Sequence, residues 1–500
     1  MKKITLLFIL ALIQMSVFAQ KFAKTPESKV STLALESEIR FFASDEMLGR
    51  KTGSVSNQVA ARYVAEAFRA AGLKPASGQT DFLQKIPFEN LKAINKGSIF
   101  DGTDSLKMSK NFIAFGGSDD VNLATTEVVF AGYGWQDATK GTDDYKGLNV
   151  KGKIVITRAG NEDAKSPQDL FSAATAKRKF AKDQGALAVI EIFAAAIPWP
   201  TVSGFFSGEN MVLADSPNAE KRVPLYWINA ASAKTWTKDA LKTVAINVPK
   251  RERTSLSSSN VIGVIEGTDP NLKGQYVVLS AHYDHIGFGK AVGKVTAEDS
   301  IFNGTRDNAF GTMALLTAAR SLAASKPKRS ILCIAYTGEE VGLLGSKYYS
   351  EHPLVPLNTC VYNLNCDGGG YNQTTTLVLM GLGRTDADPQ IQAAAKAVGL
   401  ELKNDPAPEQ GLFDRSDNVS MASKGIPAPT FSPGFTGFDD AIFKYYHQAA
   451  DNPDNIDYKY LKKYCQSFTY AGRLIANRPT APIWVSGDKY EPAFKELYKK

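Results

Sequence analysis

The sequence predicts an α/β protein: a mixed, largely parallel sheet sandwiched by helices, with a small β-rich insertion. From residue 254 onward, apolar runs alternate with helical patterns in a strand, loop, helix rhythm. Those runs are near-continuously apolar, which indicates strands buried on both faces. Between residues 112 and 251, short β-branched runs broken by glycine replace that rhythm. Because a chain of 500 residues is too long for one compact domain, we expect two units.

The N-terminus has the layout of a secretory signal peptide. Two lysines precede an apolar run at 4–13, and small residues follow at Ser16 and Ala19. The run is too short for a resident membrane helix, and no later stretch is long and apolar enough for one. We therefore expect residues 1–19 to be a signal peptide. The mature protein is expected in the periplasm or outside the cell, without stable membrane insertion.

Residues 20–111 are expected to form the N-terminal part of the main domain. Apolar residues at 57–71 recur with the period of an amphipathic helix that stops at Gly72. Weaker strand signals follow it.

The insertion at 112–251 is expected to be a separate β-rich domain. Prolines and glycines at 198–208 mark a loop-rich stretch within it. This region contains no histidine and no close acidic cluster after a strand, so we expect the chemistry elsewhere. The expected elements are strands at 127–134, 153–158 and 186–193 and a helix at 171–184.

Residues 252–500 are expected to complete the main domain. Strands are expected at 261–266, 276–281, 330–336, 361–366 and 376–380. Helices are expected at 309–324, 389–398 and 458–475.

Charge and cysteine content exclude some classes of function. The formal net charge of +7 is not gathered into a basic stripe, and aromatic residues are not interleaved with bases, so we expect no nucleic-acid partner. The four cysteines lack the spacing of a thiolate zinc site. Cys333 lies inside an apolar run and is expected to be a buried free thiol. A bridge between Cys360 and Cys366 stays open.

Polar side chains follow the predicted strands. His282 and Asp284 come after one strand, and four further segments contain the candidate residues Asp307, Glu339, Glu340, Asp367, Tyr446 and His447. In open α/β sheets, reactive groups gather beyond the carboxyl ends of strands. The chain has only four histidines, and three of them lie in these segments.

Two histidines and three carboxylates form the ligand set of a two-metal hydrolase. Hydrolytic zinc binds imidazole nitrogen and carboxylate oxygen and leaves a position for water. Two zinc ions about 3.5 to 4 Å apart can share a bridging carboxylate and a hydroxide. Asp307, Glu340 and Asp367 with a hydroxide would neutralise two divalent cations. The sequence therefore favours a centre with two Zn²⁺ ions.

Six motifs carry a family resemblance. They are A-H-Y-D-H-I-G (281–287), N-G-T-R-D-N-A-F-G (303–311), Y-T-G-E-E-V-G-L-L-G-S (336–346), N-L-N-C-D-G (363–368), S-D-N followed by G-I-P-A (416–428) and Y-H-Q-A-A-D-N (446–452). In this order they resemble the co-catalytic di-zinc aminopeptidase family, whose relatives include glutamate carboxypeptidases and glutaminyl cyclases. The resemblance extends to L-G-R-K-T-G-S (48–54) and implies a zinc-exopeptidase-like fold.

The insertion resembles a protease-associated domain. The resemblance is carried by F-A-G-Y-G (130–134), D-Y-K-G-L-N-V-K-G-K-I-V (144–155) and K-F-A-K-D-Q-G-A-L-A-V-I (179–190). It implies a discontinuous peptidase domain, with the inserted domain restricting what enters the cleft.

The family resemblance implies a role for each ligand. His282 and Asp367 would bind one zinc, Glu340 and His447 the other, and Asp307 would bridge them.

Four residues nearby would support the reaction. Glu339 matches the general base, within reach of a metal-bound water. Tyr446 matches a tyrosine that steadies the oxyanion. Asp284 would hydrogen-bond the free nitrogen of His282. His285 would have a supporting role rather than a ligand's. The resemblance also implies a cis peptide bond between Asp307 and Asn308.

We therefore expect an exported zinc aminopeptidase acting on peptides with free N-termini, through a hydroxide that bridges two zinc ions. A carboxypeptidase for acidic C-termini stays open, because Arg306 and Arg415 could bind a carboxylate. A glutaminyl cyclase would use one zinc, and a receptor-like protein would have lost ligands.

Three residues depart from the family pattern. Asn418 stands where many relatives have histidine, and Arg306 and Phe310 stand where smaller residues are common. These departures concern substrate preference. His352, the remaining histidine, is expected in an exposed loop.

Overall fold

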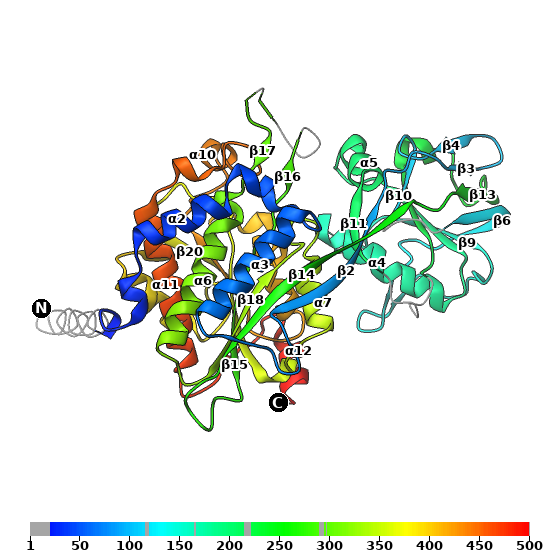
Figure 1. Cartoon of the computed structure of the whole chain (residues 1–500). Coiled ribbons are helices and arrows are strands. Elements are labelled where there is room, and N and C mark those ends of the chain that lie inside the picture. Colours follow the sequence, from blue (N-terminus) through cyan, green and yellow to red (C-terminus); the bar gives the residue numbers. More distant parts are fainter. Residues whose placement is uncertain are drawn as a thin grey trace, which may run out of the picture. The chain divides into compact units, whose positions relative to one another are not determined.

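The structure is a computed structural model that describes residues 21–115, 120–164, 167–214, 222–289, 295–296 and 298–499. The chain divides into two compact units: unit 1 contains Met1–Pro87 and Ser257–Lys500, and unit 2 contains Phe88–Leu256. The chain passes between them within β2 (Leu83–Leu91) and again within β14 (Arg253–Ile265) (Figure 1). The expected signal peptide, residues 1–19, lies outside the described residues.

Unit 2 begins earlier than the expected boundary at residue 112. Residues 98–100 and 105–107 form strands β3 (Ser98–Phe100) and β4 (Ser105–Lys107). β3 pairs with both β4 and β13 (Thr243–Val248), so this stretch belongs to the sheet of unit 2. Its strands are short, which explains why the sequence signal was weak.

Unit 1 is built on a mixed sheet, as the sequence predicts. Along the sheet the neighbours are β2, β14, β18, β15, β19, β22, β20 and β21. β18, β15, β19 and β22 run parallel to one another, while β14 and β20 are antiparallel to their neighbours β18 and β22. The remaining bounds are β18 (Ser330–Tyr336), β15 (Tyr276–His282), β19 (Cys360–Cys366), β22 (Thr430–Pro433), β20 (Thr376–Met380) and β21 (Glu401–Asn404).

Helices cover both faces of this sheet. Leu279 of β15 packs into one core cluster and its neighbour Val278 into another, because successive strand residues point to opposite faces. The first cluster includes residues of α2 (Thr32–Phe42), α3 (Val55–Ala70), α6 (Phe310–Ala324), α8 (Asp388–Ala397) and α11 (Tyr458–Ala476). The second includes residues of α7 (Leu344–Glu351), α9 (Asn418–Ala422) and α12 (Glu491–Tyr498).

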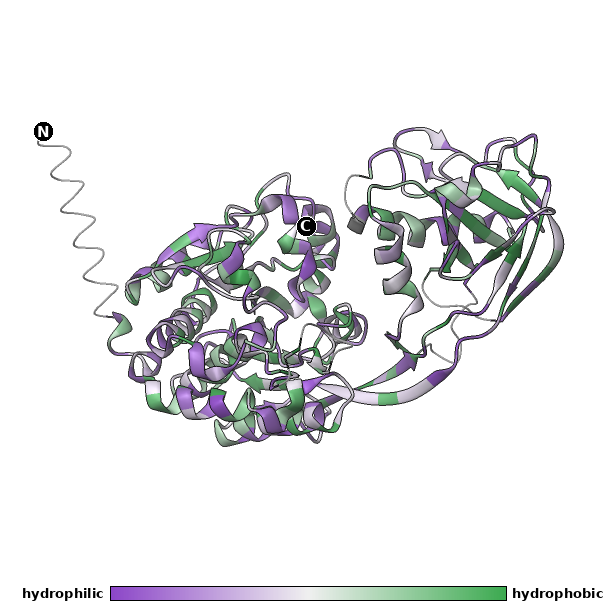
Figure 2. Ribbon diagram, turned by 90° about the horizontal axis from the view of Figure 1, so that it is seen from above, coloured by the Kyte–Doolittle hydropathy of each residue, from purple (hydrophilic) through white to green (hydrophobic). Residues whose placement is uncertain are grey.

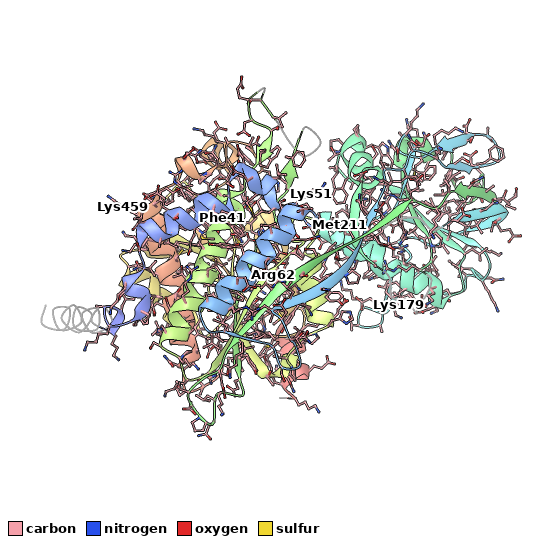
Figure 3. All side chains as sticks on the ribbon, viewed as in Figure 1. Phe41, Lys51, Arg62, Lys179, Met211 and Lys459 are labelled. Carbon is pink, nitrogen blue, oxygen red and sulfur yellow. The ribbon has the colours of Figure 1, made fainter. Side chains whose placement is uncertain are left out.

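Capping residues and one-sided hydrophobicity explain where the helices form. α3 begins after Ser54, whose side chain accepts a hydrogen bond from the Asn57 amide, and ends just before Gly72, where φ is +83°. Its residues are hydrophobic on one side only, and Figure 2 shows such mixed hydropathy along the helices of unit 1. The outward side chains include Phe41 and Arg62, both labelled in Figure 3 and both exposed.

Unit 2 has its own sheet, in the order β4, β3, β13, β6, β9, β10, β12 and β5. The stretch at 198–208, expected to be loop, forms α5 (Trp199–Ser207). Pro198 and Pro200 fit there because proline is tolerated in the first turn of a helix. Further elements are β5 (Phe112–Ala114), β6 (Val121–Phe130), β9 (Ile154–Arg158), α4 (Pro167–Asp183), β10 (Ala188–Phe193), β11 (Asn210–Leu213) and β12 (Leu225–Asn229).

All four cysteines are buried and free, so the open possibility of a bridge between Cys360 and Cys366 is not realised. Cys333 is the buried thiol that the sequence predicts. Within the described ranges, the helices are too short or too polar to cross a membrane.

Candidate metal centre

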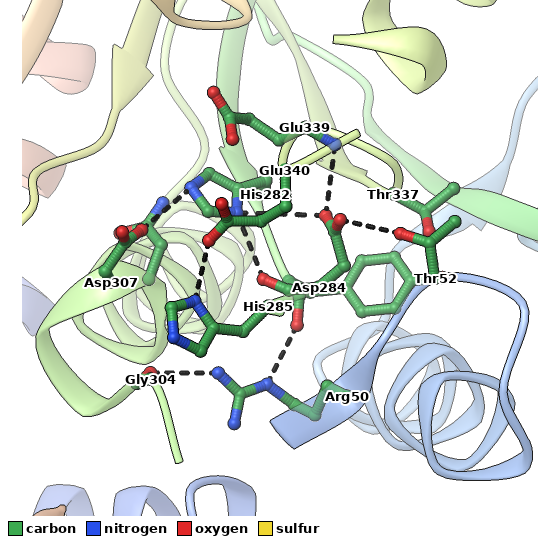
Figure 4. A network of polar contacts seen from close by, with 12 residues as sticks. Arg50, Thr52, His282, Asp284, His285, Gly304, Asp307, Thr337, Glu339 and Glu340 are labelled. Carbon is green, nitrogen blue, oxygen red and sulfur yellow. Dashed lines mark hydrogen bonds and ion pairs between the residues drawn. The ribbon is translucent and has the colours of Figure 1, made fainter. Parts of the chain in front are cut away.

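The candidate residues converge at one edge of the unit 1 sheet. His282 is the last residue of β15, Glu339 and Glu340 follow β18, and Asp367 follows β19. Asp307 lies in η4 (Thr305–Ala309), directly before α6, and its peptide bond to Asn308 is cis. Figure 4 shows His282, Asp307, Glu339 and Glu340 side by side although they come from separate parts of the sequence.

Asp307 stands between two histidines. Its Oδ1 lies 3.4 Å from His282 Nε2, and its Oδ2 lies 3.2 Å from His447 Nε2. Beyond them, His282 Nε2 lies 3.2 Å from Asp367 Oδ1, and His447 Nε2 lies 3.1 Å from Glu340 Oε2. The carboxylate at the centre therefore faces a histidine and carboxylate pair on each side.

Two groups of donor atoms are close enough to hold cations. One consists of His285, Asp307, Glu340 and His447, and the other of His282, Glu339 and Asp367, and within each group the donor atoms lie within 4.8 Å of one another. Imidazole nitrogen and carboxylate oxygen are the ligands of hydrolytic zinc. The residues present therefore fit two zinc ions.

The carboxylates create a strong negative field at the histidines. Burial opposes protonation of His447, but the charge of Glu340 and hydrogen bonds to Asp307 and Glu340 outweigh it and raise the pKa of His447 to about 11. The pKa of His282 is also raised, against its burial, mainly by Asp367 and Glu339. A field that retains protons on two buried imidazoles also attracts metal cations.

The donor groups open into a cavity of about 100 Å³. Besides the carboxylates and His447, its wall contains Tyr446, Arg415 and a glycine run at 368–370. An apolar part of the wall is formed by Met380, Leu412, Phe435, Phe438 and Ile442.

Comparison with known proteins finds a family match at this site. Residues 260–471, which contain every candidate ligand, match Peptidase family M28. Because the match covers less than half of the chain, it marks a resemblance to that family.

Individual relatives are distant. Aminopeptidase YwaD of Bacillus subtilis (strain 168) is 26% identical over 216 residues, which cover 42% of this chain and 43% of the relative. A probable glutamate carboxypeptidase, AMP1 of Arabidopsis thaliana, is 24% identical over 493 residues, covering 84% of this chain and 64% of the relative. The chain thus spans less than two thirds of the length of these curated relatives.

The fold has a counterpart among solved structures. An aminopeptidase from Aneurinibacillus sp. strain AM-1 superposes with a TM-score of 0.54 at 21% identity, covering 89% of this chain and 94% of that one. This likeness shows that the two chains share a fold.

Glu339 and Tyr446 lie where the M28 resemblance implies catalytic roles. Both line the cavity beside the donor atoms. Burial, reinforced by the charges of Asp367 and Glu340, raises the pKa of Glu339 well above its ordinary value, although His282 acts in the opposite direction. Burial and the neighbouring carboxylates also raise the pKa of Tyr446, so its hydroxyl stays protonated. The Tyr446 ring stacks on the His447 ring at a centroid distance of 4.2 Å.

Gly369 makes room for Tyr446. A Cβ atom at position 369 would lie 2.4 Å from Cδ2 of the tyrosine ring, closer than packed atoms approach. The glycine run of the cavity wall therefore fixes where the Tyr446 ring can lie.

Asp284 differs from the prediction. His282 Nδ1 lies 3.2 Å from the main-chain carbonyl of Asp284, whereas the nearest carboxylate oxygen is 3.8 Å away. The carboxylate instead accepts hydrogen bonds from the Thr52 hydroxyl at 2.7 Å and the Glu339 amide at 3.3 Å. The prediction of a carboxylate bond to His282 is wrong, because these two donors hold the side chain. Asp284 therefore links His282 to the loop that contains Glu339.

His285 contacts Glu340, one of the predicted ligands. Its Nδ1 lies 2.6 Å from Glu340 Oε1, while His447 approaches the other oxygen of that carboxylate. His285 Nε2 is buried and has no hydrogen-bond partner among the described residues. The supporting role that the sequence analysis gives to this histidine stays a prediction.

The sequence analysis gave no role to three residues that hold the site together. Arg50 is fully buried and donates to the carbonyls of Phe42, Tyr283, Asn303 and Gly304 at 2.6 to 2.9 Å. Figure 4 shows its bond to Gly304. It thereby ties the loop after β15 to the loop before Asp307. Thr52 fixes Asp284, and Ser416 donates to Asp367 Oδ2 at 2.5 Å. All three lie in quoted motifs, which was the available signal.

The residues that depart from the family pattern are structural. Arg306 is buried, pairs with Asp451 at 2.7 Å and bonds the Asn455 side chain at 2.8 Å. Phe310 packs in the core, and Asn418 donates to the Ala428 carbonyl. His352 is exposed at the C-terminal end of α7.

Proposed function

We propose that this chain is an exported aminopeptidase with two zinc ions, which hydrolyses the first peptide bond of substrates with a free N-terminus. The arrangement of Asp307 carries the proposal: its two oxygens face two different histidines, each backed by a further carboxylate. Such a carboxylate can bridge two metals. The M28 match and the aminopeptidases among the similar proteins support it.

The predicted ligands and the side chains around them would have different roles. His282, Asp367, Asp307, Glu340 and His447 would hold the metals. Bound zinc polarises the scissile carbonyl and lowers the pKa of water.

The side chains around the metals would handle protons and charge. Glu339, which lines the cavity beside the donor atoms, would take a proton from the attacking water and deliver it to the leaving amine. The protonated hydroxyl of Tyr446 would donate to the developing oxyanion. Arg50 and Asp284 would hold the loops that position these groups.

A carboxypeptidase needs basic side chains for a free carboxylate. Of the two arginines that the sequence offered for this purpose, Arg306 is occupied by Asp451 and does not line the cavity, whereas Arg415 does line it. A single arginine is not the cluster that a carboxypeptidase for acidic C-termini needs, which supports the aminopeptidase. Two further proposals remain from the sequence: residues 1–19 direct export, and unit 2 is a protease-associated domain.

The test compares free and blocked substrates. Zinc-loaded protein should hydrolyse leucine anilide and leave acetyl-leucine anilide intact. Glu339→Gln should lower kcat by about 10²- to 10⁴-fold with unchanged zinc content, the range expected for loss of a general base. Glu351→Gln, at an exposed position, is the matched control. Near-normal activity of Glu339→Gln, or equal cleavage of the blocked substrate, would contradict the proposal.

A further inference from the structure

One basic side chain in the wall of the metal-site cavity has no partner. Arg415, the last residue of η7 (Leu412–Arg415), is exposed and lines the cavity together with Glu339 and Glu340. No hydrogen bond or ion pair joins it to another residue within the described ranges of the chain. Its positive charge nevertheless reaches the site, because it acts to lower the pKa of the Tyr446 hydroxyl.

The acidic residue beside it is already taken. Asp414 accepts a hydrogen bond from the Tyr490 hydroxyl at 2.8 Å and pairs with Lys489. A second arginine nearby is likewise used, because Arg384 pairs with Asp488 at 2.7 Å and stacks over Phe413. Asp414 and Arg384 thus have partners other than Arg415, and the guanidinium of Arg415 is left for a ligand.

The residues of the cavity wall indicate the chemical class of that ligand. Of the described residues that line the cavity, only Arg415 and His447 have basic side chains, and His447 faces the metal carboxylates. Apolar side chains, Leu412 among them, line the same cavity as Arg415. A guanidinium next to an apolar surface is suited to binding a carboxylate through two parallel hydrogen bonds.

We propose that Arg415 determines specificity by binding a carboxylate of the substrate, a proposal that rests on the peptidase activity inferred above. A peptide offers this group in two places. One is the side chain of an N-terminal aspartate or glutamate, whose methylene groups would lie along the apolar wall. The other is the C-terminus of a dipeptide.

Two ratios of kcat/KM separate these sources. The first compares glutamic acid anilide with leucine anilide, and the second compares Leu-Leu with Leu-Leu amide. Both are measured for the full zinc-loaded chain and for Arg415→Met, which keeps length and removes charge. We expect one ratio to fall about 10- to 100-fold, as for loss of a charge-assisted pair. The ratio that falls identifies the source of the carboxylate.

Matched variants exclude a general charge effect. Arg415→Lys, which keeps the charge without the planar fork, should recover part of the lost ratio. Arg62→Met removes a positive charge outside the cavity, from a surface pair with Glu66 and Asp81, and should leave both ratios unchanged. If neither ratio falls in Arg415→Met, or if Arg62→Met changes them equally, the proposal is overturned.

A binding measurement keeps the inference separate from the activity. Glutarate is titrated into the zinc-loaded protein by calorimetry, and its Kd should rise at least about 10-fold in Arg415→Met. Equal affinity for both proteins overturns the role of Arg415 even if leucine anilide is cleaved. Weaker binding in Arg415→Met together with no cleavage of any peptide would retain the carboxylate site and reject the aminopeptidase.

Discussion

Buried charges are handled in opposite ways in the two units. In unit 2, Lys177 and Glu191 are both fully buried and pair at 2.5 Å. Lys177 also donates to the Arg158 carbonyl, and Glu191 accepts from the Trp227 indole. In unit 1, the carboxylates of Asp307, Glu340 and Asp367 lie against histidines, Ser416 donates to Asp367, and Arg415 also lines the cavity. The first cluster is a closed ion pair, whereas the second is a group of carboxylates and histidines that could hold cations.

The difference shows how a structural ion pair is told from a binding site. Both clusters are buried and both have shifted pKa values: burial lowers the pKa of Lys177 and raises that of Glu191. At the metal centre, by contrast, the charges of neighbouring carboxylates outweigh burial and raise the pKa values of His282 and His447. The excess of one sign of charge, and not burial itself, identifies the site.

Metal removal should cause the largest change, and it should affect the metal centre without affecting the ion pair of unit 2. Phenanthroline should lower hydrolysis of leucine anilide on the order of 10³-fold, because the metals contribute several kcal/mol to the stabilisation of the transition state. Added Zn²⁺ should restore the rate. Chelation should leave the unfolding of unit 2 unchanged, since its buried pair needs no cation. A rate that is insensitive to chelation would rule out the metal centre.

Removing one partner breaks the balanced pair of unit 2. Lys177→Met leaves a buried carboxylate uncompensated and should destabilise unit 2 by about 3 to 5 kcal/mol. Tryptophan fluorescence in a denaturant series measures this, because four of the five tryptophans lie in residues 88–256.

The control for that variant replaces both charges. Lys177→Met combined with Glu191→Leu should recover most of the stability, because no unpaired charge remains buried. If the double variant is as unstable as the single one, the pair is not the cause.

Within unit 1, a buried arginine that holds the loops of the metal centre can be compared with one that does not. Arg50→Met should weaken zinc binding about 10- to 100-fold, as for other residues that support metal ligands. Competition with a fluorescent chelator measures the affinity.

Arg473→Met is the matched control for Arg50. Arg473 is also a buried arginine of unit 1, but it pairs with Glu27 and bonds the carbonyls of Ser321 and Ser325. This variant should lose stability and keep its zinc affinity. An equal loss of affinity in both variants would show that Arg50 acts only through general stability.

Proton release is the smallest expected effect. In the metal-free protein the pKa of His447 is raised from 6.5 to about 11, so at pH 8 the imidazole holds a proton that zinc must displace. The raised pKa also means that this proton stabilises the metal-free fold below pH 6.5, a contribution lost as the pH rises through about 11. Calorimetry in buffers of different ionisation enthalpy should show net proton release on zinc binding, reduced in His447→Gln. Equal release in both proteins would contradict the raised pKa.

The sequence predicted the strands of the metal centre because each is a continuous apolar run followed by a polar residue. β18 and β20 have the expected bounds, and β15 extends one residue further, to His282. The bond partner of Asp284 could not be predicted, because it depends on Thr52, far away in the sequence. Arg50 was missed for the same reason: its partners are main-chain carbonyls, which leave no pattern in the side chains.

The separation of Arg50 from its partners has a consequence for synthesis. Tyr283, Asn303 and Gly304 lie 233 to 254 residues further along the chain, beyond all of unit 2. At a translation rate of about 5 to 20 residues per second, these partners are synthesised roughly 10 to 50 s after Arg50. A growing chain that has completed unit 2 therefore contains one whole folding unit and about a quarter of the other. An active metal centre cannot form until the ribosome has nearly finished.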